Sequence, residues 1–97
     1  MSVTRMNNFD AALGKQDELR DVLRGVVALV QTLDGCESCH LLRDAQEAHR
    51  FLIVEVWASI AHHQAAAQAI PRDKIAQVMP LLAAPPRGSY YETDRAY

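Results

Sequence analysis

The segment Arg50-Phe-Leu-Ile-Val-Glu-Val-Trp57 decides the fold of this chain. Its β-branched and aromatic residues are typical of a strand, and successive side chains of a strand point to opposite faces of the sheet. Both faces of this strand are apolar, one with Leu52, Val54 and Val56 and the other with Phe51, Ile53 and Trp57. Because such a strand needs cover on both sides, we expect a sheet with helices on one face and a second layer on the other.

The residues before this strand predict a hairpin, a long helix and a first strand. Residues 37–43 suit a strand, and the polar residues 44–49 connect it to the segment above as an antiparallel hairpin. Residues 15–33 carry apolar side chains at three- and four-residue spacing, which indicates an amphipathic helix that stops at Gly35. Residues 3–9 are expected to form a short strand at the start of the chain.

Two further helices and a last strand are predicted after Trp57. Ser59 can cap a helix that runs to residue 69. A second helix is expected over residues 72–82, with its last turn bent or shortened at Pro80 because proline has no amide hydrogen. Residues 89–95 then suit a final strand.

The element order β-α-β-β-α-α-β predicts an α+β protein of the ferredoxin-like type, with one antiparallel sheet and helices on a single face. At 97 residues the chain is expected to be one domain, residues 1–97. The face of the sheet without helices would then be uncovered. We expect another copy of the chain to cover it, which predicts a homodimer.

Composition narrows the functional classes. The chain has 10 Lys and Arg against 12 Asp and Glu, a formal net charge of −2, and 49% hydrophobic residues. This balance offers no bulk attraction to nucleic acid, which needs several cations to displace phosphate counterions. The apolar runs are far shorter than the roughly 20 residues that cross a bilayer, and the start of the chain lacks the pattern of a signal peptide. We therefore expect a soluble, cytoplasmic protein.

Two cysteines, Cys36 and Cys39, are too few for a disulfide-stapled module. In a regular strand they point to opposite faces, about 10 Å apart, which is beyond the roughly 7 Å limit for a disulfide. No second pair of ligands stands at zinc spacing. We expect two buried free thiols and no metal site.

Four motifs in order along the chain resemble the antibiotic biosynthesis monooxygenase family. They are Leu13-Gly-Lys15, Leu33-Asp-Gly-Cys36, the run from Arg50 to Ser59, and Val78-Met-Pro-Leu-Leu82. The resemblance covers nearly the whole chain and implies a dimeric α/β-barrel. It also implies oxidation of quinols, phenols or related aromatic compounds by dioxygen without metal or flavin, so that no cofactor is expected. A related branch of the family degrades haem.

Oxidation of this kind requires an apolar pocket, a proton acceptor and hydrogen-bond donors for the substrate anion. Asn7 offers an amide, Trp57 an indole N–H and a flat apolar surface, and His63 an imidazole that titrates near neutral pH. Helical spacing places His63 with Ile60, Ala67 and Ile70 on the side that faces the sheet, and His62 with Ser59, Ala66 and Ala69 on another side. We name His63, Asn7 and Trp57 as candidate catalytic residues. Each also has a purely structural interpretation, as core or as a satisfied polar group.

Glu55, His62 and Phe51 are candidate substrate-binding residues. Glu55 shares a strand face with Phe51, and a carboxylate in such surroundings is expected to be paired or functional. Arg5 or Arg43 could supply the paired cation, which is the structural alternative.

The chain also departs from the family pattern. Quinol-oxidising members often have a histidine nine residues after the tryptophan, where this chain has Ala66. The helix histidine of the haem-degrading branch would fall at Ala66 or Ala67, so haem would need His62 or His63 instead. Two hypotheses stay open: a cofactor-independent monooxygenase acting on a small aromatic or quinol-like ligand, and a non-catalytic dimer that binds a small molecule or has a stress-related role. The second predicts a pocket whose polar groups are all paired within the protein.

Overall fold

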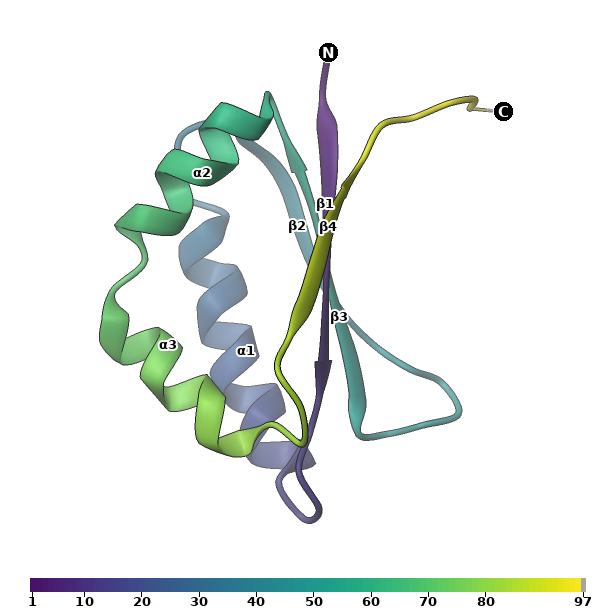
Figure 1. The fold of residues 1–97 in the computed structure, drawn as a ribbon, viewed down its shortest axis with the longest axis vertical. Helices are drawn as coiled ribbons and strands as arrows, with labels where there is room; N and C mark the ends of the chain where they lie inside the picture. The colour runs from purple at the N-terminus through teal and green to yellow at the C-terminus, as the bar shows by residue number, and fades with distance from the viewer. Residues whose placement is uncertain (97) are drawn as a thin grey trace.

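A computed structural model describes residues 1–96 of the chain. The elements follow the predicted order (Figure 1). They are β1 (Val3–Asp10), α1 (Gln16–Val30), β2 (Cys36–Arg43), β3 (Arg50–Trp57), α2 (Ile60–Ala69), α3 (Arg72–Val78), the short 3-10 helix η1 (Met79–Leu81) and β4 (Arg87–Tyr91). None of the helices among these residues is both long and apolar enough to span a membrane.

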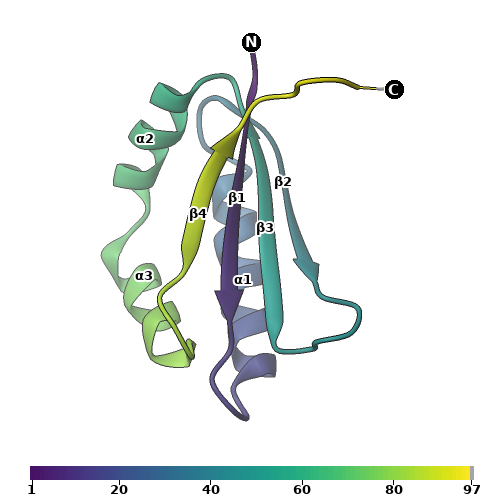
Figure 2. The same ribbon diagram turned by 45° about the vertical axis from the view of Figure 1, so that its right-hand side comes forward.

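The four strands form one antiparallel sheet in the order β2-β3-β1-β4. Figure 2 shows the strands side by side, and in Figure 1 all three α-helices lie on the same face of the sheet. The ferredoxin-like α+β prediction is therefore confirmed. The strand quoted first in the sequence, β3, lies inside the sheet between β2 and β1.

Two boundaries differ from the predicted ones: the long helix was expected over residues 15–33, but α1 ends at Val30, and the last strand also has other bounds. The last strand was expected over residues 89–95, but β4 covers Arg87–Tyr91. Its pairing with β1 ends where Tyr91 faces Thr4, near the start of β1, so the following residues have no strand to pair with. Pro80 acts as expected, because α3 ends at Val78 and continues only as η1.

The core lies between the sheet and the helices. Trp57, Leu19, Leu23 and Ile53 are its largest fully buried side chains. On β3 the odd-numbered side chains are buried, whereas Leu52, Val54 and Val56 are only half-buried and Arg50 is exposed. This places the odd-numbered side chains against the helices. The alternation of burial along β3 therefore identifies the face of the sheet that can border a site beneath the helices.

The opposite face of the sheet, which we call the open face, has no covering layer within residues 1–96 and mixes apolar side chains with polar ones such as Ser38 and His40. It carries the side chains of Met6, Leu42, Leu52, Val54, Val56 and Tyr91. Leu42 and Tyr91 are 50% and 51% exposed. A group of exposed apolar side chains of this kind is typical of an interaction site.

The prediction for the two cysteines is wrong in two respects, their orientation and the burial of Cys36. A bulge between Cys36 and Ser38 shifts the register, so that Cys36 pairs with Trp57 and Cys39 pairs with Glu55. Both partners point toward the helices, so both thiols lie on that same face. Cys39 is buried and Cys36 is half-buried, and both are free. Burial raises the pKa of Cys39 to about 12, which makes a reactive thiolate unfavourable there.

We expect Gly35→Ala to destabilise the fold more than Gly14→Ala. Both glycines have a positive φ, +83° at Gly35 and +76° at Gly14, where an alanine is strained by about 1–2 kcal/mol. An added Cβ at Gly14 meets nothing within 4 Å, whereas at Gly35 it would lie 2.4 Å from His62 Cδ2. Urea unfolding of both variants separates the effect of backbone strain from that of the steric clash with His62. Equal losses in the free energy of unfolding would contradict this account.

Candidate active site

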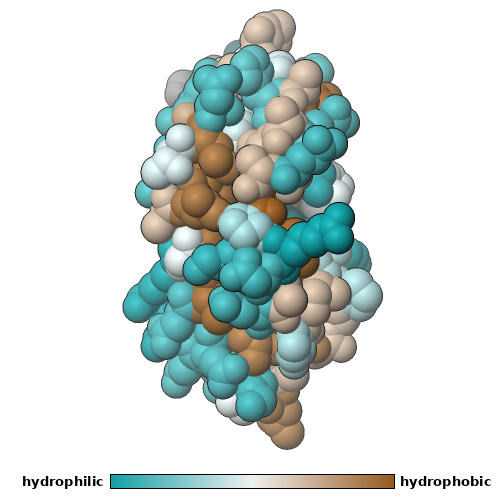
Figure 3. All heavy atoms as spheres, turned by 90° about the vertical axis from the view of Figure 1, so that its left-hand side faces the viewer, coloured by the Kyte–Doolittle hydropathy of each residue, from teal (hydrophilic) through white to brown (hydrophobic). Residues whose placement is uncertain are grey.

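An apolar cavity of about 260 Å³ lies between the sheet and the helices. Much of its wall is aliphatic, including Leu23, Val26, Val30, Leu33, Ile70 and Val78. Ile75 and Met79, which also line it, are about half exposed. Figure 3 shows apolar side chains reaching the surface between hydrophilic ones on the side of α2 and α3. The cavity therefore combines an apolar wall with access from the helical side.

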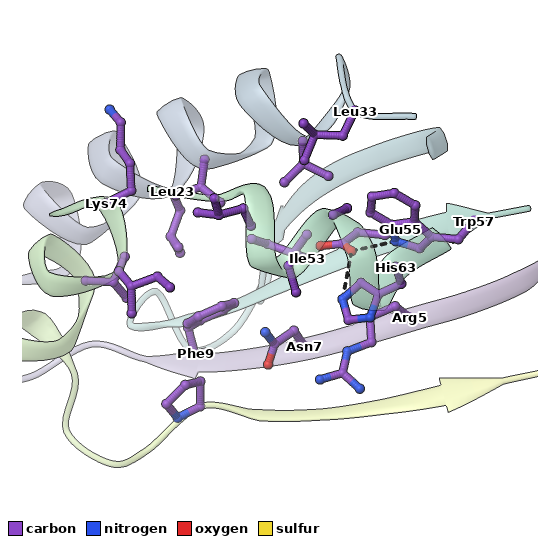
Figure 4. A pocket seen from close by; sticks show the side chains of 18 of the residues that line it. Arg5, Asn7, Phe9, Leu23, Leu33, Ile53, Glu55, Trp57, His63 and Lys74 are labelled. Carbon is purple, nitrogen blue, oxygen red and sulfur yellow. Dashed lines mark hydrogen bonds and ion pairs between the residues drawn. The ribbon is translucent and has the colours of Figure 1, made fainter. Parts of the chain in front are cut away.

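Most polar groups of the cavity gather at one end. In Figure 4, Glu55, Trp57, His63 and Arg5 lie together, Asn7 lies beside them, and Lys74 lies at the far end. Arg5 and Asn7 come from β1, Glu55 and Trp57 from β3, His63 from α2 and Lys74 from α3, so the site joins the start of the chain to its second half. The sheet register brings Arg5 directly opposite Glu55.

Glu55 is the one buried charged residue among those described, with 8% exposure. Its Oε1 accepts a hydrogen bond of 2.7 Å from Trp57 Nε1. Neither expected arginine forms a close ion pair with it. Arg5 acts on it only through its charge, and Arg43 stacks on the Phe51 ring at 4.8 Å and pairs with Asp17 at 3.5 Å. The prediction of Arg43 as a partner of Glu55 is therefore wrong.

His63 is held between three side chains. Its Nδ1 lies 2.5 Å from the hydroxyl of Tyr90, and its Nε2 lies 3.9 Å from Glu55 Oε1. Its ring meets those of Trp57 and Tyr90 edge to face, with centroids 5.5 and 5.2 Å away. The imidazole side chain is 17% exposed. These contacts hold the ring in one orientation at the cavity wall.

The surroundings shift the pKa values of both groups toward one another. Burial raises the pKa of Glu55, although the Trp57 hydrogen bond and the Arg5 charge act in the opposite direction. Burial also lowers the pKa of His63, and the charge of Arg5 lowers it further. Neighbouring titratable groups with pKa values shifted by burial in a cavity are typical of candidate sites for proton transfer.

Arg5 lies over β4 rather than toward Glu55. Its guanidinium carbon is 4.7 Å from the centre of the Tyr90 ring, and its Nε is buried without a hydrogen-bond partner in the described residues. A Cβ at Gly88 would lie 2.3 Å from Arg5 Nη2, so the glycine leaves the space that the guanidinium occupies. Arg5 thus brings a positive charge to the cavity wall.

The structure brings Asn7, Trp57, His63 and Glu55 together at the cavity but separates His62 and Phe51 from it. His62 Nδ1 lies 2.7 Å from Ser59 Oγ, and its Nε2 is 4.0 Å from Asp34, outside the cavity. Phe51 is buried beneath Arg43 at the other end of β3. These two candidate substrate-binding residues therefore do not line the cavity that contains Glu55.

The predicted inner face of α2 is rotated slightly in the structure. Ala66 is the buried residue of this helix, and Ala67 and Ile70 line the cavity, whereas Ile60 is exposed. The grouping of Ala66 with the outward His62 was therefore wrong. Small side chains at 66 and 67 leave room for the cavity beside His63.

Sequence reasoning considered Arg5 only as a structural partner of Glu55, and it left open which of Tyr90 and Tyr91 borders a pocket. The alternation of β1 could have indicated Arg5, because it lies two positions before Asn7 and therefore on the same face. No sequence signal places Tyr90, because the pairing of β4 with β1 decides which of Tyr90 and Tyr91 faces the helices.

Solved structures of the same fold come from distant organisms, and 66 chains match. Rv0793 from Mycobacterium tuberculosis has a TM-score of 0.85 at 22% identity, covering 100% of both chains. SnoaB, a cofactor-independent oxygenase from Streptomyces nogalater, has a TM-score of 0.83 at 18% identity, covering 98% of this chain and 95% of that one. A conserved protein from Methanosarcina mazei Go1 has a TM-score of 0.88 at 8% identity, with coverage of 97% and 94%. At these identities the matches show the fold.

The sequence has no significant match among functionally curated proteins. A family model, however, matches most of it: residues 2–71 match antibiotic biosynthesis monooxygenase. This range includes Arg5, Asn7, Glu55, Trp57 and His63, and Tyr90 lies beyond it. The chain belongs to the antibiotic biosynthesis monooxygenase family.

Proposed function

We propose that the protein is a cofactor-independent monooxygenase that oxidises a small aromatic, phenolic or quinol-like compound with dioxygen. The observation that carries this proposal is the pair Glu55 and His63 at the wall of an apolar cavity of about 260 Å³. An aromatic ring fits the aliphatic wall, and the pair offers a proton acceptor beside it. Family membership supports the same class of reaction.

The proposed reaction balances without an external reductant. The Glu55–His63 pair takes a proton from the substrate, and the resulting electron-rich anion reacts with dioxygen. One oxygen atom enters the substrate, and the other leaves as water with two hydrogens that the substrate itself supplied. The protein contributes the proton acceptor and an apolar site that excludes water.

Arg5 and Asn7 are the groups suited to stabilise the substrate anion. Arg5 supplies a positive charge, and the Asn7 side chain lines the cavity without a hydrogen bond to any of the described residues. Fixed charges and donors in a site of low polarity stabilise a developing anion strongly. Trp57 has a different role, because its N–H already binds Glu55. It positions the carboxylate and offers its ring to the substrate.

The pairing of polar groups favours this proposal over a non-catalytic binding protein. The alternative predicts that every polar group of the pocket is paired within the protein. Instead, Arg5 Nε is buried without a partner, and Asn7 makes no hydrogen bond among residues 1–96. Haem degradation has less support, because Ala66 and Ala67 cannot bind iron and His63 is already held by Tyr90.

We propose further that the protein forms a homodimer through the open face. Val54 and Val56 are only half-buried in the single chain, although they belong to an interior strand. A second copy placed on this face would complete the cover that a strand with two apolar faces requires. This arrangement agrees with the dimeric barrel that the family resemblance implies.

We expect the protein to accelerate oxygen consumption by hydroquinones and polyphenols. Uptake would be measured with an oxygen electrode across a panel of these compounds, with the heat-denatured protein giving the rate of autoxidation. Metal chelators should leave the stimulated rate unchanged. No stimulation above autoxidation across the panel would contradict the proposed function.

A further inference from the structure

Tyr90 is a residue of the site that neither the sequence motifs nor the matched family range includes. We propose that Tyr90 fixes the proton of His63 on Nε2, so that Glu55 rather than His63 accepts the proton of the substrate. This inference rests on the proposed function for its chemistry, because it resolves which member of the Glu55–His63 pair is the base. The arrangement of Tyr90, His63 and Glu55 can also be tested without any substrate.

The first step is the position of the two imidazole nitrogens. Nδ1 lies 2.5 Å from the Tyr90 hydroxyl, and Nε2 faces Glu55 Oε1 at 3.9 Å. A neutral imidazole carries one N–H and one lone pair. Because burial and the charge of Arg5 both lower the pKa of His63, the neutral form is favoured at neutral pH. The two neighbours therefore decide which nitrogen carries the hydrogen.

The second step is that Glu55 favours a hydrogen on Nε2. An ionised carboxylate only accepts hydrogen bonds, and it repels a nitrogen lone pair that faces it. A hydrogen on Nε2 removes that repulsion and points toward Oε1. Nδ1 then holds the lone pair.

The third step is that Tyr90 fits the complementary role. Its hydroxyl can donate to the Nδ1 lone pair, and none of the described residues offers it another acceptor at hydrogen-bond distance. The cation beside its ring, Arg5, has donors only. The three side chains are therefore arranged in sequence: the Tyr90 hydroxyl donates to His63 Nδ1, and the N–H at His63 Nε2 points toward Glu55.

In this arrangement His63 has no free lone pair that could accept a proton from a substrate in the cavity. Glu55, in contrast, accepts Trp57 at Oε1 and has no partner for Oε2 within residues 1–96. Figure 4 shows the carboxylate at the cavity wall, between Trp57 and Ile53. Oε2 is then the atom that takes the substrate proton. His63, Tyr90 and Trp57 are positioning residues that hold the carboxylate in place.

The test is the tautomer of His63 in the free protein, read from the ¹⁵N resonances of its ring at neutral pH. We expect a protonated Nε2 and an unprotonated Nδ1. In Tyr90→Phe the Nδ1 resonance should shift toward that of a nitrogen without a hydrogen bond. Tyr91→Phe is the matched control, because Tyr91 lies on the open face, and His62 is the internal control. The Nδ1 resonance of His63 should not change in Tyr91→Phe, and the ring resonances of His62 should not change in Tyr90→Phe.

Two results would overturn the inference: a proton on Nδ1 in the unmodified protein, or an unchanged Nδ1 resonance in a folded Tyr90→Phe variant. Near-ultraviolet circular dichroism establishes that the variant is folded. Because no substrate enters this experiment, the expected tautomer together with absent oxygen uptake would refute the proposed function alone. If oxidation is observed, Tyr90→Phe should lower kcat and leave KM unchanged, as expected of a residue that acts through Glu55.

Discussion

Glu55→Gln is expected to lower kcat/KM for oxidation of the best quinol substrate by about 10²- to 10⁴-fold, the usual range for loss of a positioned acid or base. Glutamine keeps the shape of the side chain and can still accept the hydrogen bond from Trp57 Nε1. It cannot take up a proton. The variant therefore removes proton transfer while it preserves packing in the core.

The pH dependence provides a second measurement on the same variant. Burial raises the pKa of Glu55, so the base is protonated and inactive at low pH, and kcat/KM should rise with pH through a pKa above that of an ordinary carboxyl. This rise should be missing from the residual activity of Glu55→Gln. Glu47→Gln is a control at an exposed glutamate.

His63→Gln distinguishes the two possible bases. Glutamine at this position still has N–H groups that can point toward Glu55, so the loss of kcat/KM should be smaller than in Glu55→Gln. A larger loss in His63→Gln, with a wild-type pH profile for Glu55→Gln, would assign the proton acceptor to His63 instead.

Val54→Asp is expected to dissociate the homodimer, raising its dissociation constant by about 10²-fold or more, as for central residues of an interface. Val54 lies at the middle of β3 on the open face, with β2 on one side and β1 on the other. His40 lies opposite Val54 on β2, but a carboxylate buried among the apolar side chains of the interface would still lose most of its hydration. Sedimentation velocity at micromolar concentration measures the change.

Two further variants separate assembly from folding. Leu42→Asp changes an exposed side chain of the same face and should weaken the dimer without disturbing the core. Leu13→Asp introduces the same charge at a fully exposed site outside the sheet and should leave the dimer intact. A stable, folded monomer of the unmodified protein at micromolar concentration would refute the dimer.

The candidate site shows which of its features local sequence patterns predict. The alternation of β3 placed Glu55 on the same face as Trp57, and the structure has both at the cavity. Helical spacing placed His63 on the inner side of α2 but assigned Ala66 to the wrong side. A ten-residue helix with few large side chains has a weak apolar stripe, so packing against the sheet decides its rotation.

The sequence by itself determined the order of the elements and the α+β class, because these follow from repeats of two and about 3.6 residues that each segment carries alone. It showed that β3 is apolar on both faces, but the structure decided which of the two faces the helices cover. Only the tertiary structure decided the bulge that turns Cys36 and Cys39 to one face, the length of β4, and the choice of Tyr90 over Tyr91 at the site. These features depend on strand register. Register is set by pairing between segments distant in the chain, and a shift of one residue moves every side chain to the other face.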